Sequence, residues 1–263
     1  MNIGFSHWIE MEKKPRYVIR KESFDAVIFD MDGVITQTAG THASAWKRLF
    51  DDYLREIENR KGIPFRPFDI QKDYLLYVDG KPRYEGVRSF IESRGLEIPP
   101  WGDTNDDPGF ETICSIGNRK NGLFHEILEK EGVAVYESTM VLIHRLRSLK
   151  IKTAVVTSSK NGSTVLEAAK IVRLFDSQVD GLDAERLSLP GKPNPDMFIH
   201  AAQNMDVMPE RAVVVEDAIA GVAAGKLGKF GFVIGVDRGE QNDELIENGA
   251  DIVVKDLSEI SAG

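Results

Sequence analysis

The sequence alternates short apolar runs with amphipathic segments from residue 24 onward, and this alternation constrains the fold more than any other feature. Apolar residues in the segments 140–150 and 195–205 recur at i, i+3 and i+4 spacing, which is typical of helices that bury one side. Strands that alternate with helices form a parallel sheet covered by helices, so we predict an α/β fold. Its buried strands are expected at residues 26–30, 152–157, 178–182, 212–216 and 231–236, with a weaker sixth at 251–254.

One interval, residues 43–133, interrupts the alternation because it contains no recognisable buried strand. Its helical segments are separated by loops rich in polar residues, proline and glycine. A mostly helical insertion after the first strand of a parallel sheet is most simply a second domain. We therefore expect a core made of residues 24–42 and 134–263, a helical cap at 43–133, hinges at 36–42 and 133–138, and an N-terminal extension of unknown role at 1–23.

Composition and charge exclude several classes of protein. The formal net charge is −9 and lysine and arginine form no basic stripe, so we expect no nucleic-acid partner. No apolar run approaches the roughly 20 residues of a membrane helix, and the N-terminus is too charged for a signal peptide. A single cysteine, Cys114, leaves no internal disulfide and no cysteine-only zinc site. We expect a cytoplasmic monomer that acts on a small molecule and contacts no membrane.

Two carboxylates follow the first predicted strand, in the sequence Asp30-Met31-Asp32-Gly33. In an open α/β sheet, ligands bind beyond the carboxyl ends of the strands, so Asp30 emerges where an active site is expected. Gly33 permits the chain to turn there, and Asp32 can then serve the same site. The alternative is a strand that ends in an ordinary Asp-Gly turn, which is common.

Three further polar motifs follow later strands. Thr157 and Ser158 precede a helix, where hydroxyls and backbone N–H groups can bind an anion. Lys192 lies in a loop before another helix, and Glu216 and Asp217 are carboxylates of the kind that bind Mg²⁺. Each motif alone has an ordinary alternative, namely a helix N-cap, a solvated lysine or a capping aspartate. Together they put an anion site, a cation and metal-binding carboxylates beyond successive strands.

The four motifs read DMDGVIT, VVTSS, GKPNPD and VVVED, and together they resemble the haloacid dehalogenase superfamily of phosphotransferases over residues 24–255. The segments 32–46 and 118–121 are similar to the branch of β-phosphoglucomutases and sugar phosphatases. The resemblance implies a Rossmann-like parallel-sheet core with an inserted, mainly α-helical cap. It also implies Mg²⁺ as the cofactor and a small phosphorylated metabolite, a sugar phosphate, as the substrate.

The resemblance implies a role for each motif residue. Asp30 is the nucleophile that forms an aspartyl phosphate, and Asp32 is the general acid and base. The transferring phosphate is bound by Thr157, Ser158 and Lys192. The metal is held by Asp30, the Asp32 backbone carbonyl, Glu216 and Asp217. Substrate contacts are expected at His42, Trp46, Gly86, Arg88, Lys120, Lys160 and Asn161, with Thr38 at the hinge and Arg83 as a further cationic candidate in the cap.

The acceptor of the phosphoryl group distinguishes a phosphatase from a mutase. In β-phosphoglucomutase, a lysine precedes the glycine matched here by Gly86 and an arginine follows it by three residues. Glu85 and Ser89 hold those positions in this chain. A glutamate would repel the second phosphate of a bisphosphate intermediate, so we predict hydrolysis of a sugar phosphate. The alternatives are a β-phosphoglucomutase-type mutase and a non-catalytic phosphometabolite-binding protein, and the intact motif residues argue against the latter.

Overall fold

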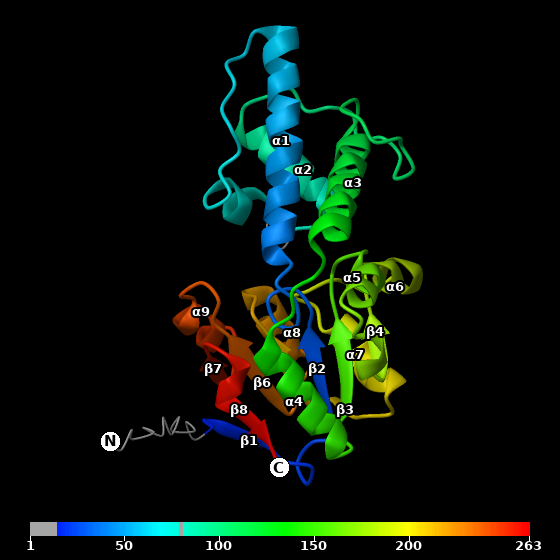
Figure 1. The fold of residues 1–263 in the computed structure, drawn as a ribbon, viewed down its shortest axis with the longest axis vertical. Helices are drawn as coiled ribbons and strands as arrows, with labels where there is room; N and C mark the ends of the chain where they lie inside the picture. The colour runs from blue at the N-terminus through cyan, green and yellow to red at the C-terminus, as the bar shows by residue number, and fades with distance from the viewer. Residues whose placement is uncertain (1–14, 79–80) are drawn as a thin grey trace, which may run out of the picture.

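The computed structural model describes residues 15–78 and 81–263, with a six-stranded parallel sheet at its centre (Figure 1). The strand order is β4-β3-β2-β5-β6-β7, and neighbouring strands are parallel. This arrangement confirms the predicted α/β fold. The strands are β2 (Ala26–Asp30), β3 (Lys152–Val156), β4 (Ser177–Val179), β5 (Ala212–Glu216), β6 (Phe232–Val236) and β7 (Ile252–Val254).

β2 lies inside the sheet and is buried along its whole length. It pairs with β3 on one side and with β5 on the other, so the carboxyl ends of these strands meet at one edge. β4 is shorter than the predicted strand at 178–182, because Asp180 caps the helix that follows. Its side chain accepts hydrogen bonds from the backbone N–H groups of Leu182 and Asp183.

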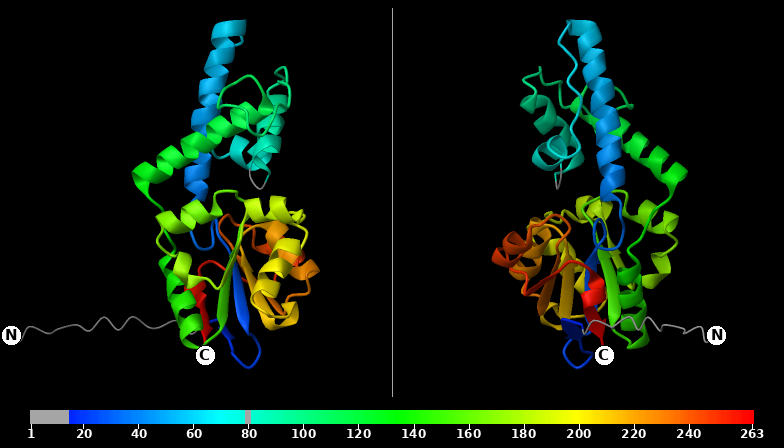
Figure 2. Two further views of the ribbon diagram at one scale, coloured as in Figure 1. Left: turned by 90° about the vertical axis from the view of Figure 1, so that its right-hand side faces the viewer. Right: turned by 60° about the vertical axis from the view of Figure 1, so that its left-hand side comes forward.

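Helices cover both faces of the sheet (Figure 2). Val27 and Phe29 pack in one apolar cluster with residues of α4 and α5, whereas Ala26 and Ile28 pack in another with residues of α7 and α8. Alternate residues of a strand point to opposite faces, so a strand covered on both sides is apolar throughout. The core helices are α4 (Glu137–Ser148), α5 (Gly162–Ala168), α6 (Gly181–Leu187), α7 (Asp196–Asn204), α8 (Ile219–Leu227) and α9 (Asn242–Glu247), with 3₁₀ turns at Val172–Leu174, Pro209–Arg211 and Leu257–Glu259.

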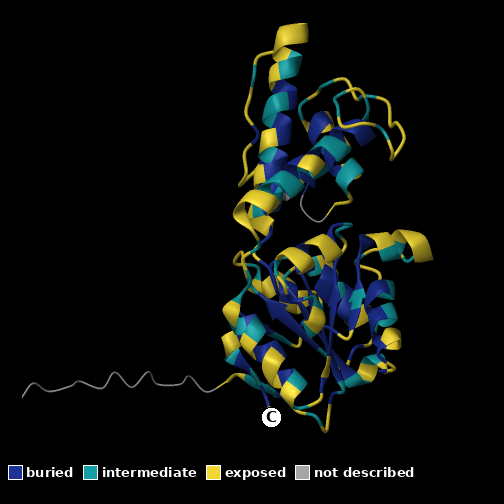
Figure 3. Cartoon of the chain, turned by 45° about the vertical axis from the view of Figure 1, so that its right-hand side comes forward, coloured by how far each residue is buried: buried dark blue, intermediate teal, exposed yellow. Residues whose placement is uncertain are grey.

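A helical body, here called the cap, stands beyond the carboxyl ends of the strands (Figures 1 and 3). Its buried centre includes the rings of Phe50, Phe68 and Phe90, and burying such a side chain contributes about 1.5–3 kcal/mol. The described residues between 43 and 133 contain no strand, and no described helix of the chain is long and apolar enough to cross a membrane. The elements of the cap are α1 (Ala39–Lys61), a π-helical turn (Tyr74–Val78), α2 (Arg83–Ser93) and α3 (Ile113–Glu131).

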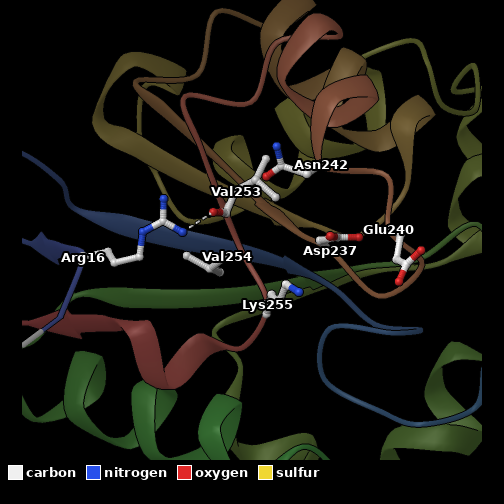
Figure 4. A pocket seen from close by; sticks show the side chains of 7 residues that line it. All are labelled: Arg16, Asp237, Glu240, Asn242, Val253, Val254 and Lys255. Atoms are coloured by element: carbon white, nitrogen blue, oxygen red, sulfur yellow. Dashed lines mark hydrogen bonds between the residues drawn. The ribbon is translucent and has the colours of Figure 1, made fainter. Parts of the chain in front are cut away.

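Part of the expected N-terminal extension is attached to the core. β1 (Tyr17–Ile19) pairs in parallel with β8 (Ile260–Ala262), and the Tyr17 ring stacks on Phe232 with centroids 4.2 Å apart. Arg16 donates a hydrogen bond to the carbonyl of Val253 at 2.8 Å (Figure 4). A run of three residues is too short to be recognised as a strand from its pattern, which is why the sequence did not indicate β1. Residues 1–14 lie outside the described residues.

A pocket of about 340 Å³ lies near the carboxyl ends of β6 and β7, and Figure 4 shows the side chains that line it. It is lined by Arg16, Asp237, Glu240, Asn242, Val253, Val254 and Lys255. None of these described lining residues belongs to the four motifs, so the chemistry that the sequence predicts lies elsewhere.

Candidate active site

The chain turns sharply after β2, so both aspartates of the first motif lie in or next to one tight loop. Gly33 has a φ of +89°, and its N–H donates to the carbonyl of Thr36 at 2.8 Å. A Cβ at this position would stand 1.8 Å from Asp217 Oδ2. Glycine is therefore required for the backbone conformation and for the close approach of Asp217.

Lys192 joins the carboxylates of two neighbouring strands. Its ammonium group donates hydrogen bonds to Asp30 Oδ1 and to Glu216 Oε1, the latter at 2.5 Å. The side chains of all three residues are at most 10% exposed. Glu216 Oε2 accepts hydrogen bonds from the backbone N–H groups of Asp217 and Ala218, each at 3.0 Å. Glu216 is thus held from both sides and fixes Lys192 beside Asp30.

The site carries more negative than positive charge. Burial raises the pKa of Asp30 well above its ordinary value, and the charges of Glu216 and Asp217 add to this effect, whereas Lys192 opposes it. Burial and then the charge of Glu216 raise the pKa of Asp217 to about 8. Burial acts to lower the pKa of Lys192, but the charges of Asp30 and Glu216 outweigh it, so that pKa is raised. A further cation would be stabilised here.

Asp30, Glu216 and Asp217 can approach a single cation, because one carboxylate oxygen from each lies within 4.8 Å of the others. Oxygen ligands of this kind are those that Mg²⁺ prefers. Both oxygens of Glu216 already accept hydrogen bonds, so a metal would compete for them. The donor set and its excess negative charge fit the magnesium ion that the sequence implies.

The carboxylate of Asp32 is contacted by side chains from three segments of the chain. Oδ1 accepts a hydrogen bond from the hydroxyl of Thr38, which precedes α1, and Oδ2 accepts one from Thr157 Oγ1 at 3.2 Å. His42 Nε2 of α1 lies 3.8 Å from Oδ1. Burial raises the pKa of Asp32, although the hydrogen bonds from Thr38 and Thr157 oppose the shift. A carboxyl group that keeps its proton above the ordinary range is suited to act as a general acid.

His42 is held by Lys120 of α3, whose Nζ lies 2.7 Å from His42 Nδ1. Burial, followed by the positive charges of Lys120 and Arg83, lowers the pKa of His42 well below its ordinary value. Burial and the charge of Arg83 also lower the pKa of Lys120 to about 7. A neutral imidazole that accepts a hydrogen bond at Nδ1 carries its proton on Nε2, the atom nearest Asp32. The cap is thereby connected to Asp32 through α1 and α3.

The two predicted phosphate ligands of the second motif differ in exposure. Thr157 is buried after β3, and its Oγ1 accepts a hydrogen bond from the N–H of Ser159 at 3.1 Å. Ser158, between Thr157 and Ser159 in the sequence, has an exposed side chain. Thr157 is thus enclosed and donates its hydrogen bond to Asp32, whereas the exposed side chain of Ser158 is accessible to a ligand.

Several predicted substrate contacts of the cap do not reach the site. Trp46 and Gly86 take part in internal packing, since a Cβ at Gly86 would lie 3.4 Å from the Trp46 ring. Lys120 differs from these two, because its Nζ lies over the Trp46 ring, 5.2 Å from the centroid, and also contacts His42 beside Asp32. Arg88 is exposed and pairs with Glu92 at 3.8 Å, so the structure does not bring it to the site.

A pocket of about 300 Å³ lies between the cap and the core. Three of the residues that the sequence singled out, Arg83, Lys160 and Asn161, line it. Most of its other lining groups are amides and hydroxyls, and they come from Tyr84, Thr104, Asn105, Asn118 and Asn121. Tyr84 and the loop residues at 104 and 105 could not be selected from the sequence, because single hydroxyls and loops carry no motif.

Asn161 connects the cap with the core. Its Nδ2 donates to Asn121 Oδ1 at 2.9 Å, and its Oδ1 lies 3.0 Å from His125 Nε2. His125 is not among the residues predicted from the sequence. A signal existed, because His125 follows Asn121 by four residues, a spacing that puts both on one side of a helix.

Comparisons with known proteins identify the family of the chain. The family model described as haloacid dehalogenase-like hydrolase matches residues 24–228. The chain is 42% identical over 253 residues, 95% of its own length and 96% of the relative's, to a protein named beta-phosphoglucomutase from Mycobacterium bovis. It is 29% identical to a protein named phosphorylated carbohydrates phosphatase from Thermotoga maritima, over 88% of this chain and 94% of the relative.

A solved structure extends the likeness to the fold. The crystal structure of beta-phosphoglucomutase from Clostridium difficile has a TM-score of 0.66 and 25% identity, over 90% of this chain and 92% of that chain. The predicted resemblance, the sheet core with a helical cap, and the expectation of an enzyme of this kind are confirmed. The chain belongs to the haloacid dehalogenase-like hydrolase family.

Proposed function

We propose that the chain is a magnesium-dependent enzyme that takes the phosphoryl group from a sugar phosphate by forming an aspartyl phosphate on Asp30. The observation that carries the proposal is the meeting of Asp30, Lys192 and Glu216 at the carboxyl ends of two neighbouring strands. Burying ionised groups is costly, and a well-packed apolar cluster would stabilise the fold at least as well. A role in phosphoryl transfer explains why Asp30, Lys192 and Glu216 are buried together.

Each step can be assigned to residues of the chain. Asp30 attacks the phosphorus, and the bond from phosphorus to the sugar oxygen breaks as Asp32 gives that oxygen its proton. Lys192 neutralises charge on the attacking carboxylate and on the transferring oxygens, while Thr157 and Ser158 complete the phosphate site. An acceptor oxygen then attacks the phosphorus, Asp32 takes the acceptor's proton, and Asp30 is released as a carboxylate.

Magnesium would be held by Asp30, Asp217 and the backbone carbonyl of Asp32. When bound, it would supply positive charge between the carboxylate and the phosphate, which repel each other. Glu216 would chiefly position Lys192, because both of its oxygens already accept hydrogen bonds.

The cap controls the orientation of Asp32. Thr38 and His42 contact Asp32 from the hinge and from α1, and Lys120 fixes His42 from α3. If the cap moved away from the core, these contacts would be lost and Asp32 would no longer be oriented for proton transfer. Closure would therefore exclude water and prepare the general acid at the same time. Such coupling protects an aspartyl phosphate from water while the cap is open.

We favour a sugar hydroxyl as the acceptor, which makes the enzyme a mutase of the β-phosphoglucomutase type. The sequence predicts hydrolysis, because Glu85 would repel a second phosphate. Glu85, however, is exposed and is not among the described residues that line the pocket, whereas Arg83 is. Arginine can bind a phosphate through paired hydrogen bonds. The 42% identity to a protein named beta-phosphoglucomutase supports this choice, and hydrolysis of a sugar phosphate is the second candidate.

Product analysis tests both candidates. The enzyme is incubated with β-glucose 1-phosphate, Mg²⁺ and a trace of the 1,6-bisphosphate, and glucose 6-phosphate and free phosphate are measured together. Glucose 6-phosphate that forms much faster than free phosphate supports the mutase. The reverse result makes the chain a phosphatase. No product from this or any other sugar phosphate would refute the proposed function.

A further inference from the structure

A chain of hydrogen bonds runs from α3 to the core along one side of the pocket between the cap and the core. Arg83 and the Nδ2 group of Asn161 both donate to Asn121 Oδ1, each at 2.9 Å. Asn161 Oδ1 lies 3.0 Å from His125 Nε2. Arg83, Asn121 and Asn161 line the pocket, whereas His125 is not one of its described lining residues. His125 therefore acts on the pocket only through its neighbours.

The partners of Asn161 fix the orientation of its carboxamide. Because Nδ2 donates to Asn121 Oδ1, the Asn161 Oδ1 atom faces His125, and His125 Nε2 must carry a proton. A rotated carboxamide would set the Asn161 and Asn121 oxygens against each other, and His125 Nε2 could keep its hydrogen bond only if the ring carried its proton on Nδ1 instead. Asn161 is only 7% exposed, so water could not readily replace them. Asn121 thus fixes the orientation of Asn161, and His125 completes it by donating to Asn161 Oδ1.

We propose that His125 is a positioning residue that orients Asn161 and Asn121 toward the sugar part of the substrate and holds α3 against the core around it. This inference rests on the proposed function. Carboxamides both donate and accept hydrogen bonds, as sugar hydroxyls do, and Arg83 adds a cation at the end of the chain. The tautomer of the neutral ring that carries its proton on Nε2 supplies this donor, so the contact needs no charge on His125.

Two substitutions separate the hydrogen bond from the ring. His125→Phe keeps an aromatic ring beside Phe124, whose centroid lies 6.1 Å away, but cannot donate to Asn161. His125→Gln loses the ring but keeps an N–H donor of similar reach. His144→Phe makes the same change at an exposed position of α4 and serves as the matched control.

The experiment compares two phosphoryl donors. For each variant, kcat/KM is measured with β-glucose 1-phosphate, counting all products, and with acetyl phosphate, whose small acyl group offers no sugar hydroxyl to the pocket. His125→Phe should lower the value for the sugar phosphate about tenfold, mainly through KM, which is the factor expected for one lost buried hydrogen bond. The value for acetyl phosphate should stay within about twofold, since phosphorylation of Asp30 does not use Asn161.

His125→Gln should restore most of the preference for the sugar phosphate, and His144→Phe should leave both values unchanged. Equal losses on both donors, no loss on either, or a His125→Gln variant as impaired as His125→Phe would overturn the inference. If the unsubstituted enzyme turned over neither donor, the proposed function itself would fall, which is a distinct result.

Discussion

Replacing Lys192 by methionine removes the cation that Asp30 and Glu216 share. Methionine has a similar length and can pack beside Phe198, over whose ring Lys192 Nζ lies at 5.1 Å from the centroid. The substitution leaves two buried carboxylates without their partner, and breaking a buried pair typically costs about 3–5 kcal/mol. Because the carboxylates can relieve part of this cost by binding a proton, we expect a loss of about 3 kcal/mol in the free energy of unfolding without Mg²⁺ at mildly alkaline pH.

The size of this loss should depend on pH. Lys192 acts to lower the pKa of Asp30, which is already raised by burial, so the variant's Asp30 pKa is higher still. Between the ordinary aspartate pKa and that raised pKa, the folded variant binds more protons than the unfolded chain. Its stability therefore falls as the pH rises through this range. The stability difference from the unsubstituted enzyme should be larger at about pH 8 than at about pH 5.5.

Urea denaturation in the presence of a chelator measures both effects. Lys61→Met, which removes an exposed pair with Glu97, is the control and should change stability little. A loss below about 1 kcal/mol for Lys192→Met, or the same loss at both pH values, would refute the view that Lys192 neutralises buried carboxylates.

Three further predictions concern the residues around this pair. Lys120→Met should raise the pKa of His42 without restoring its ordinary value, because burial is the larger cause; an NMR titration of the His42 ring reports the shift. Gly33→Ala should raise the Mg²⁺ concentration needed for half-maximal activity by about tenfold or more, because its Cβ would collide with Asp217, and circular dichroism checks that the fold survives. Asp217→Ala should raise this concentration far more than Glu216→Ala does, and comparable effects would point to a different ligand set.

The sequence predicted those parts of the fold in which local pattern and burial agree. β2 and β5 are covered on both faces, so each is an uninterrupted apolar run that ends in a carboxylate. β1 and β8 are three residues long and depend on each other for their hydrogen bonds, so neither has a pattern of its own. β4 ends early because the Asp180 side chain accepts hydrogen bonds from the first backbone N–H groups of α6. The spacing of apolar residues in the sequence does not predict such a contact.

The candidate site divides in a similar way. The residues that follow strands could be selected from sequence, because the ends of parallel strands meet at one edge of the sheet. The cap residues could be selected only in part, since the direction of a side chain on a helix decides its role: His42 and Lys120 lie beside Asp32, whereas Arg88 does not reach the site. Arg83 and Arg88 lie five residues apart on α2, about 140° around the helix axis, so that only Arg83 reaches the pocket. The spacing of four residues puts His125 on the same side of α3 as Asn121, but its contact with Asn161 reveals its role.

The central claim is that Asp30 carries the phosphoryl group between donor and acceptor. The most direct measurement identifies the phosphorylated residue: the enzyme is mixed with Mg²⁺ and acetyl phosphate, quenched in acid, digested and analysed by mass spectrometry. We predict one phosphoryl group on the peptide that contains Asp30, its removal by hydroxylamine, and its absence in Asp30→Asn, which should also be inactive. A phosphoryl group on another residue, or an Asp30→Asn variant with near-normal turnover, would contradict the account.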